Sequence, residues 1–237
     1  MPSAKPRVVA LLPMKANSER VKGKNFRDFC GKPLFRWILD TLLEVEEIHQ
    51  VVINTDARQI LADNGLVETD RIVIRDRKPE ICGDLVSMNL VLADDVANVD
   101  ADAYLMTHTT NPLMSADTVR GALKAFLNSS AKGAADSLFT VDKVQTRFYR
   151  SDCSAVNHDP DKLIRTQDLE PWFEENSNLY IFTRDSFAKT NARIGKQAMM
   201  YEGPQFESID IDDPQDWDFA VVAARFLNEQ RNKETTS

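Results

Sequence analysis

A cluster of basic side chains follows the first apolar run of the chain. Between Lys15 and Arg27 there are five basic residues and a single acid, Glu19, which gives this stretch a charge of +4 (five minus one) inside a protein whose formal charge is −8. Lysine and arginine side chains in such numbers suit a polyphosphate, whose oxygens need cations and hydrogen-bond donors. A solvated surface loop is the alternative, and charge alone does not decide between the two.

The spacing of the glycines excludes the two common phosphate-binding loops. None of the eight glycines forms a Gly-x-Gly motif, so the dinucleotide-binding fingerprint is absent. Gly31-Lys32 has Phe26 at the position where a Walker A loop requires glycine. A nucleotide bound here must be held by side chains and by a turn without glycine, with backbone donors near Asn17 and Ser18.

A pair of aspartates near the end of the chain forms the second candidate site. The sequence from Ser208 to Asp213 alternates isoleucine with aspartate, and a strand would place Asp210 and Asp212 together on one face. Taken alone, such a pair is more often the solvated side of a half-buried strand. Together with a basic loop it indicates a magnesium site, because Mg²⁺ prefers carboxylate, phosphate and water oxygens.

An alternation of strands and helices must position these two sites. The continuously apolar run at 7–13 predicts a strand buried on both faces, as in a parallel sheet, and Pro33 opens a helix with one apolar face. The alternation predicts a single α/β domain with a doubly wound, mainly parallel, Rossmann-like sheet, whose ligand lies at the carboxyl ends of the strands. Further strands are predicted at 51–54, 71–74, 103–107, 137–141, 179–183 and 208–212, and further helices at 57–64, 84–96, after Ser115 and from Asp213.

One long irregular segment interrupts the alternation. Residues 142 to about 176 are polar and contain Pro160, Pro171 and several Asp and Asn. A structureless stretch of this length is uncommon inside a compact domain unless it is functional. We therefore interpret it as an insertion that serves the site or mediates assembly.

Composition and charge exclude several classes of protein. With 43% hydrophobic and 28% charged residues the chain is typical of a globular protein, and it has no apolar run long enough to cross a membrane. The 29 basic and 37 acidic residues leave a negative surface that disfavours nucleic acid. The three cysteines have neither zinc-site spacing nor an even number. We expect a cytoplasmic protein with no signal peptide, no membrane span and no nucleic-acid partner.

Five segments, in order along the chain, resemble the acylneuraminate cytidylyltransferase family, the enzymes that make CMP-activated sialic acids. Residues 13–34, PMKANSERVKGKNFRDFCGKPL, resemble the nucleotide-binding loop P-x-R-x-x-S-K-x-x-x-K-N with the following G-K-P-L. The segments at 77–87, 110–113, 176–181 and 208–213 resemble R-P-x-E-L-x-x-D-x-x-S, Q-P-T-S-P-L, N-G-A-x-Y-I and S-I-D-I-D-T.

The resemblance implies a nucleotidyltransferase that joins CTP to a sialic-acid-like 2-keto sugar acid and releases pyrophosphate. The anomeric hydroxyl would attack the α-phosphorus in line, so the protein mainly positions its substrates and neutralises charge. It also implies a homodimer formed through residues 142–176. By position, it implies that Lys24 grips the phosphates, that Asp210 and Asp212 hold Mg²⁺, and that Arg77 and Ser87 line the cytosine pocket. The remaining candidates for substrate binding are Lys15, Asn17, Ser18, Asn25, His108 and, from the insertion, Arg147 and Arg150 for the sugar carboxylate.

Departures from the family pattern concern mainly the sugar. Glu19 replaces a lysine, His108 a glutamine and Ser177 a glycine, and Glu174 stands where a basic residue is common. Glu170, Glu174 and Glu175 would give the sugar site an acidic wall, which suits an acylated or amino-bearing substituent. We therefore expect diamino nonulosonates such as legionaminate or pseudaminate to be used at least as well as N-acetylneuraminate. The alternatives are a cytidylyltransferase for a deoxyoctulosonate or a phosphonate, and an inactive nucleotide-binding homologue.

Overall fold

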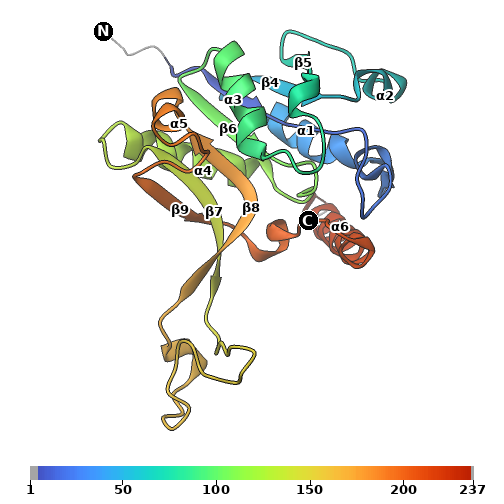
Figure 1. The fold of residues 1–237 in the computed structure, drawn as a ribbon. Coiled ribbons are helices and arrows are strands. Elements are labelled where there is room, and N and C mark those ends of the chain that lie inside the picture. The colour runs from blue at the N-terminus through green and yellow to red at the C-terminus, as the bar shows by residue number, and fades with distance from the viewer. Residues whose placement is uncertain (1–4, 236–237) are drawn as a thin grey trace.

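A seven-stranded sheet forms the centre of the computed structural model, which describes residues 5–235 (Figure 1). Its strands are β1 (Val8–Leu11), β4 (Ile48–Thr55), β5 (Ile72–Asp76), β6 (Ala103–Thr107), β7 (Ser137–Val144), β8 (Trp172–Phe182) and β9 (Ala198–Glu202). They lie in the order β5–β4–β1–β6–β8–β7–β9, and β8 alone runs against its two neighbours. The predicted mainly parallel α/β sheet is confirmed.

Helices cover both faces of this sheet. They are α1 (Leu34–Glu44), α2 (Arg58–Asp63), α3 (Met88–Asn98), α4 (Ala116–Ser130), α5 (Arg184–Thr190) and α6 (Pro214–Thr235). Val8 and Ala10 of β1 join the core cluster that contains α1 and α4, while Val9 and Leu11 join the cluster of α3 and α5. Side chains alternate between the faces of a strand, so a doubly covered β1 must be apolar throughout. None of the helices within residues 5–235 is both long and apolar enough to span a membrane.

The strand predicted at 208–212 is wrong. A short 3-10 helix, η4 (Gln205–Ser208), ends there, and residues 209–212 are irregular. Ile211 is fully buried in a third core cluster with Phe29 and Trp217, and Ile209 packs against the same cluster. Alternating apolar residues therefore anchor this segment to α6, without a neighbouring strand.

The sheet ends at β5 on one side and at β9 on the other, and no sequence pattern predicted β9. It pairs in parallel with β7, and only alternate residues along it are half-buried. Such a strand buries little apolar surface and leaves a weak signal in the sequence.

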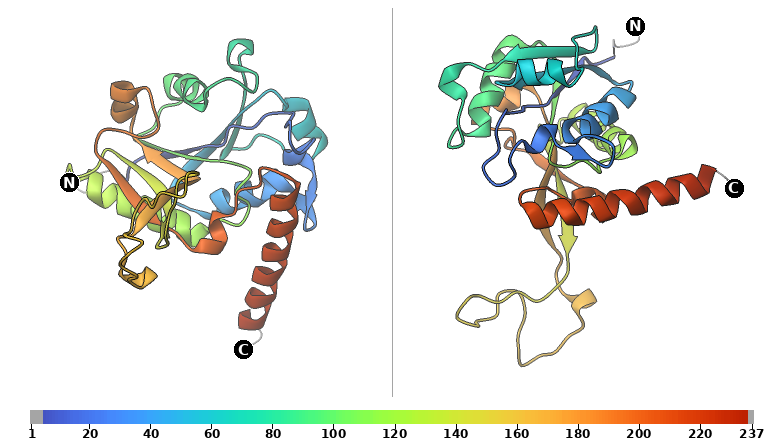
Figure 2. Two further views of the ribbon diagram at one scale, coloured as in Figure 1. Left: turned by 60° about the horizontal axis from the view of Figure 1, so that its bottom comes forward. Right: turned by 90° about the vertical axis from the view of Figure 1, so that its right-hand side faces the viewer.

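The segment between β7 and β8 projects from the body as an arm (Figures 1 and 2). The two strands remain paired as far as Val144 and Trp172, so the irregular part covers 145–171 and is shorter than the predicted 142–176. It includes one short 3-10 helix, η3 (Thr166–Asp168). Part of the polar stretch that indicated irregular structure is therefore the paired ends of β7 and β8, which lie outside the core. The far half of α6 extends beyond the body as well (Figure 2).

Candidate active site

A pocket of about 280 Å³ lies where β1, β5 and β6 end. This is the edge of an open parallel sheet at which ligands are expected. Six of the residues predicted from the sequence line it, namely Lys15, Ser18, Lys24, Asn25, Arg77 and His108. A wider groove of about 720 Å³ beside α4 is lined by Asp117, Glu202 and Glu207 and by no cation among the described residues, so it does not suit a polyphosphate.

Lys24 connects the basic loop to the aspartate segment. It begins a short 3-10 helix, η1 (Lys24–Phe26), and is only 7% exposed. Its ammonium group donates a hydrogen bond to the carbonyl oxygen of Ile211 and lies 3.9 Å from Oδ1 of Asp212. Burial lowers the pKa of Lys24, and the carboxylates of Asp212 and Asp210 oppose that shift. The two candidate sites are therefore parts of one site.

Asn25 fixes the loop in place. Its Nδ2 donates to the carbonyl oxygen of Lys15 over 2.9 Å, and its Oδ1 accepts a 2.7 Å bond from the hydroxyl of Thr109. Thr109 follows β6, so this buried amide joins the basic loop to the end of a central strand. Lys15 itself forms an ion pair with Asp84.

The other nucleotide candidates have different positions. Arg77 lines the pocket, but its Nε and Nη2 donate to Oδ1 and the carbonyl oxygen of Asn54, at 3.0 and 2.8 Å, so it also ties β4 to the pocket wall. Ser87 caps α3 by accepting a bond from the amide of Asn89 and is not part of the pocket lining. Asn17 is exposed and also outside the lining.

Asp210 and Asp212 lie in the irregular segment just before α6, and neither is among the residues that line the pocket. The amides of Asp212 and Asp213 both donate to Oδ2 of Asp216 at 2.9 Å, which fixes the turn. Burial raises the pKa of Asp210, with a smaller rise from Asp212, against the hydroxyl of Thr110 and Lys24. Oδ1 of Asp210 is buried and has no hydrogen-bond partner within the described residues. Unpaired carboxylate oxygens of this kind are ligands that a hard cation prefers.

The cations of the arm do not reach this pocket in the same chain. Arg147 donates to the carbonyl oxygen of Ile164 within the arm, and Arg150 is exposed there. Neither arginine lines this pocket, because the β7–β8 ribbon carries both away from the sheet (Figure 1), so their role as ligands of the sugar carboxylate stays a prediction.

A basic residue that sequence analysis missed lies beside the pocket instead. Arg193 follows α5, and its Nη1 is 3.5 Å from Nε2 of His108. Burial, with Arg193 and Lys24, lowers the pKa of His108 to about 3, so its imidazole is neutral at physiological pH. Arg193 lies 85 residues from His108 in the chain and belongs to no motif, so the sequence carries no local signal for this contact.

The lowered pKa of His108 makes the protein sensitive to acid. The unfolded chain binds a proton at this histidine below pH 6.5, whereas the folded protein does not until about pH 3, so stability falls as the pH drops through this window. In His108→Gln, we expect the loss of unfolding free energy between pH 6 and pH 4 to be smaller than in the wild type by on the order of 1 kcal/mol per pH unit. Urea unfolding across this range measures the difference, and parallel curves would contradict the expectation.

Comparison with known proteins agrees with the site. A family model described as cytidylyltransferase matches residues 9–216. The chain belongs to the cytidylyltransferase family. This makes it a nucleotidyltransferase enzyme, and the resemblance seen in the five motifs is confirmed.

Relatives of this cytidylyltransferase cover nearly its whole length. It is 28% identical to the CMP-N,N'-diacetyllegionaminic acid synthase of Legionella pneumophila over 89% of this chain and 93% of that protein. It is 22% identical to a pseudaminic acid cytidylyltransferase of Campylobacter jejuni, over 93% and 97%. In fold it resembles the 4-diphosphocytidyl-2C-methyl-D-erythritol synthase of Anaerococcus prevotii, with a TM-score of 0.67 at 13% identity over 92% and 96% of the two chains.

Proposed function

We propose that this enzyme transfers CMP from CTP to the anomeric hydroxyl of a nonulosonic acid and releases pyrophosphate. The observation that carries the proposal is the contact between Lys24 and the segment 210–212, since it places a buried cation of the pocket lining beside the aspartates. The names of the two relatives, which act on legionaminic and pseudaminic acids, support the choice of acceptor.

The side chains of the pocket would do most of their work by positioning and by charge. Lys24 and Lys15 bring positive charge to the triphosphate, and Asn25 holds the loop that carries them. In-line attack needs little covalent chemistry from the protein, so fixed charges and oriented donors account for most of the rate. The neutral His108 forms a polar wall that adds no further charge.

Asp210 and Asp212 fit Mg²⁺ through their donor set and through the unpaired oxygen of Asp210. When bound, the ion would supply positive charge to the phosphate oxygens. No group of three His, Cys, Asp or Glu side chains suited to a metal is found in the described part of the chain. The phosphates of CTP and water would therefore complete the coordination.

Release of pyrophosphate tests the proposal directly. The purified protein is incubated with CTP and Mg²⁺ and with each of five acceptors: a legionaminate, a pseudaminate, N-acetylneuraminate, a deoxyoctulosonate and a phosphonate. We expect turnover with the nonulosonates, and a kcat/KM for the two diamino sugars at least equal to that for N-acetylneuraminate. Turnover with only the deoxyoctulosonate or the phosphonate would replace the proposed acceptor, and no turnover with any of them would favour the inactive homologue.

CTP is expected to raise the melting temperature of the protein more than UTP, ATP or GTP do. Arg77 and its neighbours in the pocket lining would choose cytosine over the other bases by hydrogen bonds. Lys24→Ala should weaken the effect, because it removes a cation from the phosphates. Equal shifts with all four nucleotides would show that the pocket recognises only the triphosphate.

We further propose a homodimer formed through residues 142–176, which comprise the arm and the ends of β7 and β8 that lead into it. Several large apolar side chains in this range are exposed, including Leu163 at 86%, Ile164 and Phe173. In water, exposed apolar groups gathered on one protruding segment favour a partner surface that covers them. Most soluble oligomers are symmetric assemblies of identical chains, so we take a second copy of this chain as the partner.

A further inference from the structure

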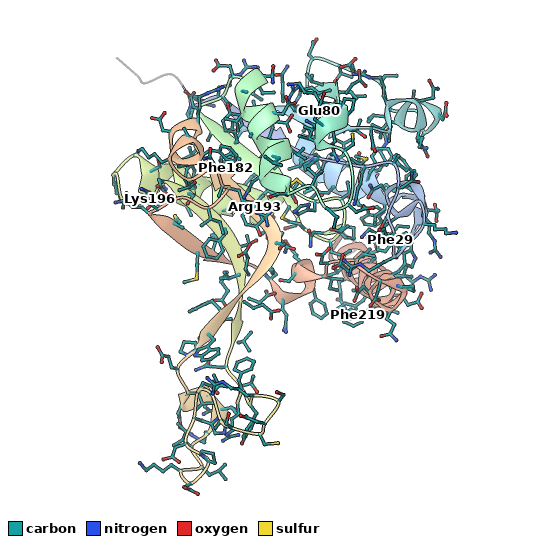
Figure 3. The ribbon with its side chains drawn as sticks, in the orientation of Figure 1. Phe29, Glu80, Phe182, Arg193, Lys196 and Phe219 are labelled. Carbon is teal, nitrogen blue, oxygen red and sulfur yellow. The ribbon has the colours of Figure 1, made fainter. Side chains whose placement is uncertain are left out.

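Arg193 lies in a polar cluster next to the pocket, where β8 leaves the body (Figure 3). Its guanidinium group stacks 3.7 Å from the ring centre of Tyr180, and its Nη2 donates to the hydroxyl oxygen of Tyr180 over 2.9 Å. Three further contacts are long: Nη2 is 3.7 Å from Oε1 of Glu175, and Nη1 is 3.5 Å from Nε2 of His108 and 3.9 Å from Sδ of Met106. The stack and the single short bond hold the guanidinium plane in one orientation.

This cluster leaves hydrogen-bond donors of Arg193 available. A guanidinium group has five N–H donors, and here one forms a short bond to oxygen. Glu175 does not depend on Arg193, because its carboxylate accepts the hydroxyl proton of Tyr180 in a shorter contact. The Arg193 side chain is 21% exposed, so a ligand in the adjoining space can reach it.

The other cations around the pocket are already engaged. Lys15 pairs with Asp84, and Lys24 contacts Ile211 and Asp212. Arg77 donates to the carbonyl oxygens of Met14, in the loop after β1, and of Asn54 in β4. Within the part of the chain that the structure describes, Arg193 lies beside the pocket with its charge held in place but only loosely paired.

The position of Arg193 also fits an acceptor site. His108 and Lys24 line the pocket, and Arg193 contacts His108 without belonging to the lining itself, so it adds a cation next to the pocket that is separate from the basic loop. A 2-keto acid brings a carboxylate that must be paired when it leaves water. A planar guanidinium group can donate to both carboxylate oxygens at once, which also fixes the orientation of the sugar.

We propose that Arg193 binds the carboxylate of the sugar-acid acceptor and thereby sets both the affinity for the acceptor and its orientation. This inference rests on the proposed function, because it assumes an acidic acceptor in the space beside His108. Tyr180 and Glu175 act as positioning residues that hold the guanidinium group. The assignment replaces Arg147 and Arg150 of the same chain as the partner of that carboxylate.

Steady-state kinetics of Arg193→Met and Arg193→Lys test the assignment. We expect Arg193→Met to raise KM for the best nonulosonate on the order of 30-fold, the loss typical of a charged hydrogen-bonded pair, and to change KM for CTP less than twofold. Arg193→Lys keeps the charge without the planar pair of donors, and its KM for the nonulosonate should lie between those of the wild type and of Arg193→Met. Lys196→Met is the matched control: it removes an exposed cation from the same loop, nearer the edge of the molecule (Figure 3), and should leave both KM values unchanged.

An acceptor whose carboxylate is converted to the carboxamide separates binding from a merely structural role. In the wild type, exchanging the acid for the carboxamide should cost about as much affinity as the Arg193→Met substitution costs with the acid. In Arg193→Met, the carboxamide should bind almost as well as the acid. Equal acid-to-carboxamide ratios in the wild type and in both Arg193 variants would overturn the assignment. So would a variant whose KM for CTP rises as much as that for the acceptor. If the wild type turns over no sugar acid at all, the proposed function fails, whereas turnover with an unchanged acceptor KM in Arg193→Met defeats the role of Arg193 alone.

Discussion

Asp210→Asn and Asp212→Asn are each expected to lower kcat for pyrophosphate release by a factor on the order of 100 or more. Both carboxylates lie near Lys24, where a triphosphate would place its charge, and each substitution removes one unit of negative charge from the proposed Mg²⁺ site. Folding should tolerate both changes. Burial already raises the pKa of Asp210, and its Oδ1 has no partner within the described residues, so a neutral amide there should keep or raise the melting temperature.

The neighbouring residue offers a control for this experiment. Oδ1 of Asp213 accepts bonds from the amides of Gln215 and Asp216, at 2.7 and 3.0 Å, and so caps α6. Asparagine caps a helix as well as aspartate does, so Asp213→Asn makes the same change of charge in the same segment with little effect on folding. We expect it to keep kcat within about threefold, because it loses no proposed ligand. Full activity of both Asp210→Asn and Asp212→Asn at saturating Mg²⁺ would contradict the metal assignment.

The sheet could be predicted from the sequence wherever burial leaves a periodic signal. The apolar run of β1 and the apolar face of α1 both identify elements that pack on a doubly covered sheet. β9 could not be predicted, because its residues alternate between exposed and half-buried and none of them is fully buried. The strand expected at 208–212 was wrong because alternating apolar residues do not require a strand. Ile209 and Ile211 instead pack into the core cluster around Trp217, and the aspartates between them stay outside that cluster.

The site could be predicted in so far as its chemistry lies in contiguous motifs. The basic loop supplied Lys24, and the isoleucine–aspartate alternation supplied Asp210 and Asp212; the structure joins them through the bond from Lys24 to Ile211, 187 residues away in sequence. Arg193 depends entirely on such a long-range contact, since it meets His108 only when α5 packs on the sheet. Residue type and spacing therefore predict the groups that do chemistry, whereas the contacts between them come from the tertiary fold.

Removal of the arm is expected to convert a dimer into a monomer and to lower pyrophosphate release on the order of 100-fold, if the arm of one copy completes the acceptor site of the other. Val144 and Trp172 are cross-strand neighbours, so residues 145–171 can be replaced by Asn-Gly, which closes a two-residue hairpin. The body should remain folded, because its core clusters consist almost wholly of residues outside this segment. Light scattering gives the mass of each protein, and thermal unfolding reports whether the body of the shortened chain is intact.

Point variants at the tip separate loss of the interface from loss of the arm itself. Leu163 is 86% exposed, and Ile164 beside it is also exposed, so serine at both positions removes apolar surface while leaving the fold of one copy unstrained. If a second copy covers these side chains, the double variant should dissociate at concentrations at which the wild type remains dimeric, and its specific activity should fall on dilution in step with its mass. A matched pair of exposed polar residues, Asp159 and Lys162, can be changed to serine as the control, which should remain a dimer. A wild-type protein that is monomeric at micromolar concentration and fully active would refute both the dimer and the role of the arm, because a site complete in one copy needs nothing from another.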